Sequence, residues 1–167
     1  MLSVRLPASL KSGAIAIAVT LTIAGCASQG PTESAMTPAA PPPDLPPAIK
    51  PQEITGAWGL AAFHNPQDLK RTEVAARNGC RQPYNIGMGP TGGVIMHMPD
   101  KAQPEELRMR GGPGNKTFIG PSGEPAGGIQ DREITSFDGR VMTVRFLDPE
   151  VAGRYGTQIF VRCAPRA

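Results

Sequence analysis

Short apolar segments separated by glycine-rich turns recur from Gln52 to the end of the chain, and this pattern most limits the fold. Runs of about four to eight residues bounded by Gly, Pro, Asn and Asp are typical of β-strands. We expect strands at residues 53–64, 84–88, 94–98, 107–110, 116–119, 129–137, 140–147 and 156–163. Short strands at this spacing predict a mostly β fold, a small antiparallel β-barrel-like domain spanning residues 52–167.

Two local signals refine this prediction. Asp138-Gly139 joins two expected strands, and Asp-Gly is typical of a two-residue hairpin with a type I′ turn. One short helix is expected after the first strand, because Asn65 can cap it, Pro66 suits its first turn and Gly79 suits its end.

The expected core is centred on the first and last strands. Trp58, the only tryptophan, lies in the first strand, and we predict that it is buried because a large ring dominates a small core. In the last strand, alternate residues share one face. We expect the inward face to carry Thr157, Ile159, Val161 and Cys163.

The start of the chain predicts export. Residues 1–25 carry two basic residues and no acidic one, and residues 14–24 are an apolar run. This pattern is that of a secretory signal peptide, and the run is shorter than the ~20 residues that a membrane-spanning helix needs. Residues 23–26 also resemble the lipobox of bacterial lipoproteins, which implies cleavage after Gly25 and a lipid on Cys26. An ordinary secretory signal peptide is the alternative.

A proline-rich segment follows the expected lipidation site. Residues 27–51 contain eight prolines among small and polar residues. Such a composition cannot bury a core, so residues 26–51 are expected to form a disordered, extended tether. Ala27, in place of Asp, resembles lipoproteins sent to the outer membrane, so the expected location is the cell envelope, lipid-anchored at the outer membrane.

The three cysteines predict one disulfide. With Cys26 lipidated, Cys80 and Cys163 remain, an even number in an oxidising compartment. Two buried free thiols are the alternative. Neither cysteine has a second Cys or His at the spacing of a metal site, so no metal site is predicted there.

This disulfide constrains the expected topology. In a strict meander the second and eighth strands run the same way, with Cys80 before the second and Cys163 at the end of the eighth. The two cysteines would then lie at opposite ends, whereas a disulfide needs Cα atoms within about 7 Å. We therefore expect a barrel-like fold in place of a perfect eight-stranded meander, with the chain crossing between ends at residues 120–128.

The charge pattern argues against a nucleic-acid partner. The net charge falls from +3 to +1 when the signal peptide is removed, since two of the basic residues lie within it. The densest charge, at residues 131–133 and 148–155, mixes both signs. Eleven of the fourteen basic residues after Gln52 are arginine, which suits bidentate pairs with carboxylates. Structural ion pairs between strands are one interpretation, and a polar partner-binding patch is the other.

Little in the sequence points to catalysis. The two histidines, His64 and His97, lie in no recognised nucleophile, metalloprotease or phosphate-binding motif, so we predict no catalytic residue, no cofactor and no enzyme activity. Met96-His97-Met98 could suit copper(I). In a strand, however, the two methionines share one face and His97 lies on the other, so methionine packing in the core is the favoured interpretation.

Two resemblances bear on function. Gly56-Ala57-Trp58, opening a small β domain behind a lipobox and a proline-rich tether, resembles the bacterial alkaline proteinase inhibitor and outer-membrane lipoprotein family. This resemblance implies an eight-stranded barrel in which the segment before the first strand can block a protease. Residues 80–84, 154–157 and 162–163 also resemble uncharacterised small bacterial lipoproteins, which implies no particular activity.

These observations predict a lipid-anchored, non-catalytic envelope lipoprotein whose β domain binds or inhibits a protein partner. The alternative is a carrier that holds a small apolar ligand or a metal within the barrel. A roomy apolar cavity would favour the carrier, and a filled core with an exposed first-strand end would favour the partner binder.

Overall fold

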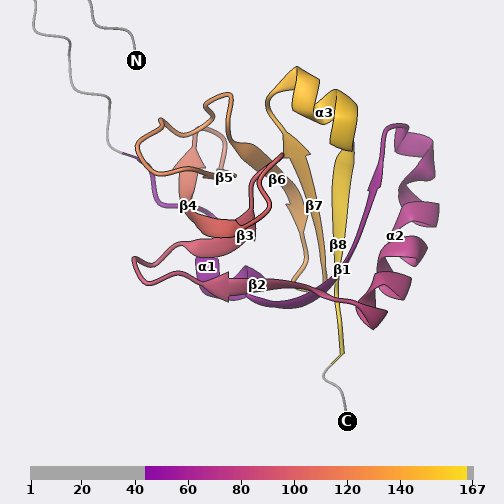
Figure 1. Cartoon of the computed structure of the whole chain (residues 1–167). Coiled ribbons are helices and arrows are strands. Elements are labelled where there is room, and N and C mark those ends of the chain that lie inside the picture. Colours follow the sequence, from indigo (N-terminus) through magenta and orange to yellow (C-terminus); the bar gives the residue numbers. More distant parts are fainter. Residues whose placement is uncertain (1–43, 165–167) are drawn as a thin grey trace, which may run out of the picture. The chain divides into compact units, whose positions relative to one another are not determined.

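The structure, a computed structural model, describes residues 44–164, which form a closed barrel of eight antiparallel strands (Figure 1). Each strand pairs with its neighbours in the chain, and the last pairs with the first. The strands are β1 (Gly56–Phe63), β2 (Tyr84–Met88), β3 (Val94–His97), β4 (Pro104–Gly112), β5 (Lys116–Gly120), β6 (Arg132–Phe137), β7 (Val141–Phe146) and β8 (Thr157–Arg162). The predicted fold class is confirmed.

The folded domain begins before Gln52. The expected signal peptide, Cys26 and most of the tether lie outside the described residues. Leu45, however, pairs with β4, where its carbonyl accepts the Gly111 N–H at 2.7 Å. The Ile49 N–H donates to the Thr117 hydroxyl at 3.3 Å. The last residues of the expected tether therefore belong to the barrel domain.

Three α-helices accompany the described strands: α1 (Pro51–Ile54), α2 (Leu69–Asn78) and α3 (Pro149–Tyr155). The predicted helix is confirmed, since Asn65 caps a short 3-10 turn (Pro66–Asp68) that leads into α2. Helix α3 was not expected from the sequence, although Asp148 caps it by accepting the N–H groups of Glu150 and Val151.

The turn between β6 and β7 differs from the expected type I′. That type needs a positive φ at both central residues. The N–H of Asp138 donates to the Val141 carbonyl, which makes Gly139 and Arg140 the central residues. Only Gly139 has a positive φ, of 87°, as in a type II′ turn.

The disulfide between Cys80 and Cys163 is confirmed, with the Cα atoms 5.6 Å apart. The barrel is nevertheless a simple meander, so the expectation that the disulfide excludes a meander was wrong. Tyr84 at the start of β2 and Arg162 at the end of β8 both pair with Trp58 of β1. Because strands in a closed barrel are staggered, the start of β2 and the end of β8 lie at the same level.

The expected crossing at residues 120–128 is not found. The segment after Gly120 joins the neighbouring strands β5 and β6. A buried ion pair between Arg110 and Asp131 holds it in place. Arg110 also donates to the Pro121 carbonyl at 2.8 Å, and Asp131 accepts the Gly127 N–H at 2.8 Å. Both ends of the segment are thus fixed to β4.

Replacing Cys80 and Cys163 together by alanine is expected to lower the free energy of unfolding by about 2–4 kcal/mol, because the unfolded chain loses the closure of a long loop. Urea unfolding monitored by circular dichroism measures this loss. A reductant should lower the midpoint of the native chain and leave the variant unchanged. An unchanged midpoint for the reduced native chain would contradict the prediction.

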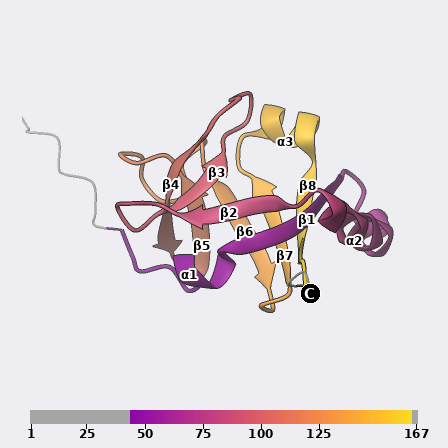
Figure 2. The same cartoon turned by 60° about the horizontal axis from the view of Figure 1, so that its bottom comes forward.

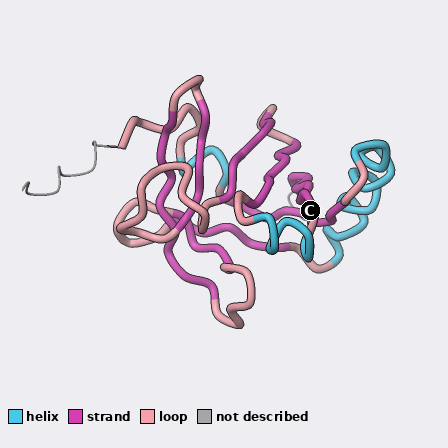
Figure 3. The backbone as a smooth tube through the Cα atoms, turned by 90° about the horizontal axis from the view of Figure 1, so that it is seen from above, coloured by secondary structure: helices cyan, strands magenta, loops and turns pink. Residues whose placement is uncertain are grey.

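The inward face of β8 is not the one that was expected, because it carries Gln158, Phe160 and Arg162. Phe160 belongs to the main core inside the barrel. Ile159 and Val161 instead pack with Ala76 of α2, which lies outside the strands (Figure 3). The expected inward set was therefore assigned to the wrong side: Thr157, Ile159, Val161 and Cys163.

Helix α2 approaches the barrel closely at Gly59 of β1. A Cβ added there would lie 1.9 Å from the Ala76 carbonyl oxygen. Any larger residue would push the helix outward, so this glycine permits the close packing of α2 on β1. The helix supplies apolar cover for the outer face of β8, which explains why the alternation along β8 made this outer face look like a core face.

The lower end of the barrel in Figure 1 is filled. Trp58 is fully buried, as predicted, and its indole N–H donates to the Ile54 carbonyl at 2.9 Å. The Arg162 guanidinium lies 4.2 Å from the centre of the Trp58 ring and donates to the Thr55 carbonyl at 2.8 Å. Figure 2, in which this end comes forward, shows α1 beside it. Helix α1 and Arg162 therefore close this end.

Candidate ligand-binding pocket

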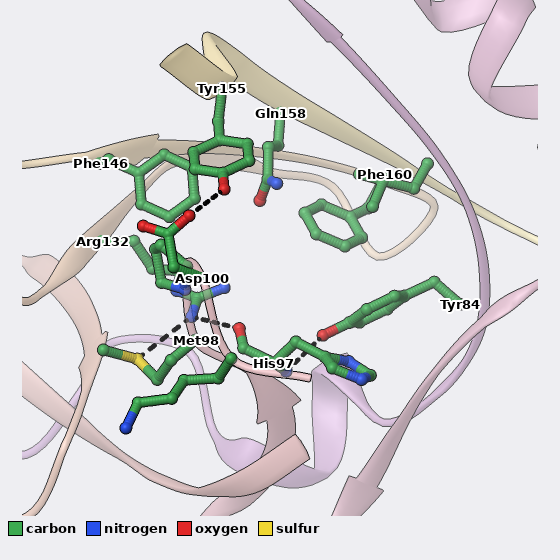
Figure 4. A pocket seen from close by; sticks show the side chains of 12 residues that line it. Tyr84, His97, Met98, Asp100, Arg132, Phe146, Tyr155, Gln158 and Phe160 are labelled. Carbon is green, nitrogen blue, oxygen red and sulfur yellow. Dashed lines mark hydrogen bonds between the residues drawn. The ribbon is translucent and has the colours of Figure 1, made fainter. Parts of the chain in front are cut away.

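The other end of the barrel, near α3, contains a cavity of about 360 Å³. Its walls come from the strands and from the segment between β3 and β4, and they include Leu60, Tyr84, Met98, Arg132, Gln158 and Phe160 (Figure 4). Pockets that hold small molecules have volumes of about 300–1,000 Å³. We call this cavity the barrel-mouth pocket.

Arg132, the first residue of β6, is a buried cation in this pocket and is only 3% exposed. Its Nη2 donates to the His97 carbonyl at 2.8 Å and contacts the Met98 sulfur at 3.6 Å. Its guanidinium carbon lies 5.4 Å from the centre of the Phe146 ring, a cation–π contact. Within residues 44–164, Arg132 forms no ion pair with a carboxylate.

This environment perturbs Arg132 without neutralising it. Burial lowers the pKa of the guanidinium, and the nearby Tyr84 and Asp131 oppose that shift. Because a guanidinium in a protein stays protonated, the pocket keeps its positive charge at neutral pH.

Two polar atoms of the pocket lack hydrogen-bond partners. Arg132 Nε and Gln158 Oε1 are buried, and neither has a partner among the described residues. Buried polar groups in folded proteins almost always have a partner, so each exception needs an explanation. Here both atoms belong to side chains that line one cavity.

Aromatic side chains form much of the wall. Tyr84 and Phe160 lie edge to face with ring centres 5.7 Å apart, and Phe146 and Tyr155 lie 6.0 Å apart. The Tyr84 hydroxyl accepts the His97 N–H at 2.8 Å. Burial raises the pKa of Tyr84, so its hydroxyl keeps a proton that it can donate.

The rim of the pocket is fastened to α3 through Asp100. Its carboxylate pairs with Arg154 at 2.9 Å and accepts a hydrogen bond from the Tyr155 hydroxyl at 2.6 Å. The bond from Tyr155 lowers the pKa of Asp100, and the same bond raises the pKa of Tyr155. Asp100 is therefore ionised at neutral pH and already paired.

In the Met96-His97-Met98 segment, the two methionines face the core and the histidine side chain is exposed. Met96 is buried in the core, and Met98 packs against it, as the favoured interpretation predicted. His97 is exposed and contributes its backbone groups to Arg132 and Tyr84. Within residues 44–164, no three His, Cys, Asp or Glu side chains gather as they would around a metal ion.

The charged segment 131–133 is divided between two roles. Asp131 pairs with Arg110, and Glu133 pairs with Arg145 at 2.7 Å, so these two form the structural ion pairs that were one interpretation. Arg132 faces the pocket. This role was not predicted from the sequence, although Arg132 lies two positions before the core residue Ile134 and hence on the same face of β6.

The disulfide lies away from the barrel-mouth pocket, since neither of its cysteines is among the lining residues.

Of the helices in the described part of the chain, none is long and apolar enough to cross a membrane. No protein-family model, curated protein or solved structure matches this chain. The pocket and its chemistry are therefore the basis on which a function is assigned.

Proposed function

We propose that this chain is a lipid-anchored, non-catalytic binding protein of the cell envelope whose barrel-mouth pocket holds a small organic molecule. One observation carries the proposal: a barrel closed at its Trp58 end keeps a cavity of about 360 Å³ at the other end, and two side chains of its lining, Arg132 and Gln158, each have an unpartnered buried polar atom. An eight-stranded barrel has room either for its own side chains or for one small ligand. The lipid anchor is the one expected at Cys26.

The contacts of the segment before β1 indicate that the pocket, and not this segment, is the binding element. A protease-blocking segment must be free to enter the partner. Here Leu45 pairs with Gly111, Ile54 is buried in the core, and Arg162 binds the carbonyl of Thr55. These residues are occupied by contacts with their own barrel. This disfavours the binding or inhibition of a protein partner through this segment, and favours the carrier function.

The composition of the pocket favours binding over covalent chemistry. Among the described residues that line it, none is a serine, threonine or cysteine. Serine, threonine and cysteine are the hydroxyl and thiol nucleophiles that a neighbouring base activates. The pocket instead combines apolar walls with a few polar groups, which is the usual composition of a small-molecule site.

Filling the pocket tests this proposal. Native mass spectrometry of the whole chain, extracted from its own membrane in a mild detergent, should show a bound small molecule. Gln158→Trp should remove it, because the indole occupies the cavity. Val74→Trp, which adds the same ring on the exposed surface of α2, should retain it.

The same bound mass on Gln158→Trp and on the native chain would contradict the pocket as the site. The native chain could instead show no bound small molecule and capture one envelope protein. If Gln158→Trp captured that protein equally well, the result would favour the protein-partner function.

A further inference from the structure

We infer that the ligand of the barrel-mouth pocket is an organic anion, a carboxylate carried on an aromatic or other apolar body, with Arg132 binding the carboxylate. This inference rests on the proposed function and names the chemical class of its ligand.

The buried positive charge of Arg132 favours an anionic ligand. A buried ion loses its hydration, and the loss is recovered only if a counter-charge or well-placed hydrogen bonds replace it. Asp131, the acidic neighbour of Arg132 in the chain, is taken by Arg110. The groups that do contact Arg132 are a carbonyl, a thioether and a ring face. The counter-charge that a buried guanidinium calls for is therefore left to the ligand.

The geometry of the Arg132 guanidinium favours a carboxylate. The guanidinium presents its donors as a planar fork that matches a carboxylate. Nη2 is used by His97, whereas Nε is buried without a partner. Figure 4 shows the guanidinium at one side of the pocket, with Gln158 and Phe160 across from it. A carboxylate in this space would give Nε its missing acceptor.

Other groups at the pocket agree with an anion. The Tyr84 hydroxyl accepts from His97 and keeps its own proton for donation to a ligand oxygen. Lys101 adds a second cation to the lining. The one carboxylate of the lining, Asp100, is neutralised by Arg154 and hydrogen-bonded by Tyr155, so its repulsion of an anion is reduced.

The apolar part of the ligand follows from the remaining walls. Leu60, Phe146 and Phe160 offer only carbon to the cavity, and the edge-to-face arrangement of Tyr84 and Phe160 leaves ring faces for a further ring. Gln158 Oε1 lacks a donor, so a hydroxyl or N–H group on the ligand would satisfy it. A small inorganic anion would leave these walls without contact.

A matched pair of probes tests the inference on the native chain. We would titrate 4-phenylbutyrate and its neutral amide into the full chain in lipid nanodiscs by calorimetry, with empty nanodiscs as the blank. The carboxylate should bind about tenfold or more tightly than the amide, because hydrogen bonds to a charged group are the stronger ones. Inorganic phosphate should bind far more weakly than the carboxylate probe.

Arg132→Met then assigns the preference to one residue. The variant should bind the two probes equally, while Arg71→Met, which removes an exposed arginine of α2, should keep the full preference. The melting temperature of Arg132→Met should equal or exceed that of the native chain, since an apolar side chain replaces an unpaired buried charge. A clearly lower melting temperature with an unchanged preference would mean that Arg132 is structural, and would overturn the inference.

The outcomes separate this inference from the function on which it rests. If the amide binds as tightly as the carboxylate, and Gln158→Trp removes both, the pocket binds a ligand but not through an anion, and the inference is wrong. If neither probe binds the native chain, the inference is also wrong. If, in addition, Gln158→Trp leaves the native chain's bound molecule in place, the proposed function fails with it.

Discussion

Replacing Trp58 by alanine should lower the free energy of unfolding by about 3–5 kcal/mol, the usual cost of removing a buried aromatic ring from a core. The ring is fully buried, lies edge to face with Phe160 at 6.4 Å, and lies beneath the Arg162 guanidinium. Its loss would leave a cavity where α1, β1 and β8 meet, and would also remove the hydrogen bond to Ile54.

Urea unfolding followed by circular dichroism measures this effect, since the variant has no tryptophan to report by fluorescence. Trp58→Phe should lose less, because it keeps an aromatic ring and gives up the indole hydrogen bond. An unshifted midpoint for Trp58→Ala would mean that Trp58 contributes nothing to the core. The description of the lower end of the barrel as closed by a buried Trp58 would then be wrong.

Asp131→Ala should cost about 3–5 kcal/mol as well, because it leaves the Arg110 guanidinium buried without its partner. Both side chains of the pair are almost completely buried, at 4% and 0% exposure. The variant also removes the acceptor of the Gly127 N–H and so loosens the segment between β5 and β6.

The double variant Arg110→Met/Asp131→Ala provides the control. It removes both charges, so most of the loss should be recovered, as happens when a buried ion pair is replaced by apolar side chains. If the double variant loses as much stability as Asp131→Ala and Arg110→Met lose in sum, the buried charge is not the cause. Urea midpoints of the four chains complete this cycle.

The strands, the capped helix and the disulfide were predictable because each depends on local signals or on a simple count. Asn65 and Pro66 mark a helix start, glycine-rich segments mark hairpins, and two cysteines remain for one bond. Helix α3 carries a similar signal at Asp148 and Pro149, but residues 148–155 were considered only for their dense charge.

Stagger and sidedness were not predictable, since both depend on contacts between distant residues. The level at which β2 and β8 meet β1 is set by barrel closure, and no turn sequence encodes it. The outer face of β8 resembles a core face because α2, about eighty residues earlier in the chain, covers it.

The pocket escaped prediction for the same reason. In the sequence, Arg132 lies between two acids and looks like one member of a surface charge cluster. Only the fold shows that Asp131 pairs with Arg110 on another strand and that Glu133 pairs with Arg145, so that Arg132 is buried without an ion pair. The assignment of a ligand class thus depends on long-range pairing of the neighbours of Arg132.

A crystal structure of the chain grown with 4-phenylbutyrate tests the central claim most directly. We expect the carboxylate within hydrogen-bonding distance of Arg132 Nε, with the phenyl ring against Phe160 and Tyr84. Electron density for the ligand elsewhere on the protein, or an empty barrel-mouth pocket at a concentration that saturates binding in solution, would contradict the account.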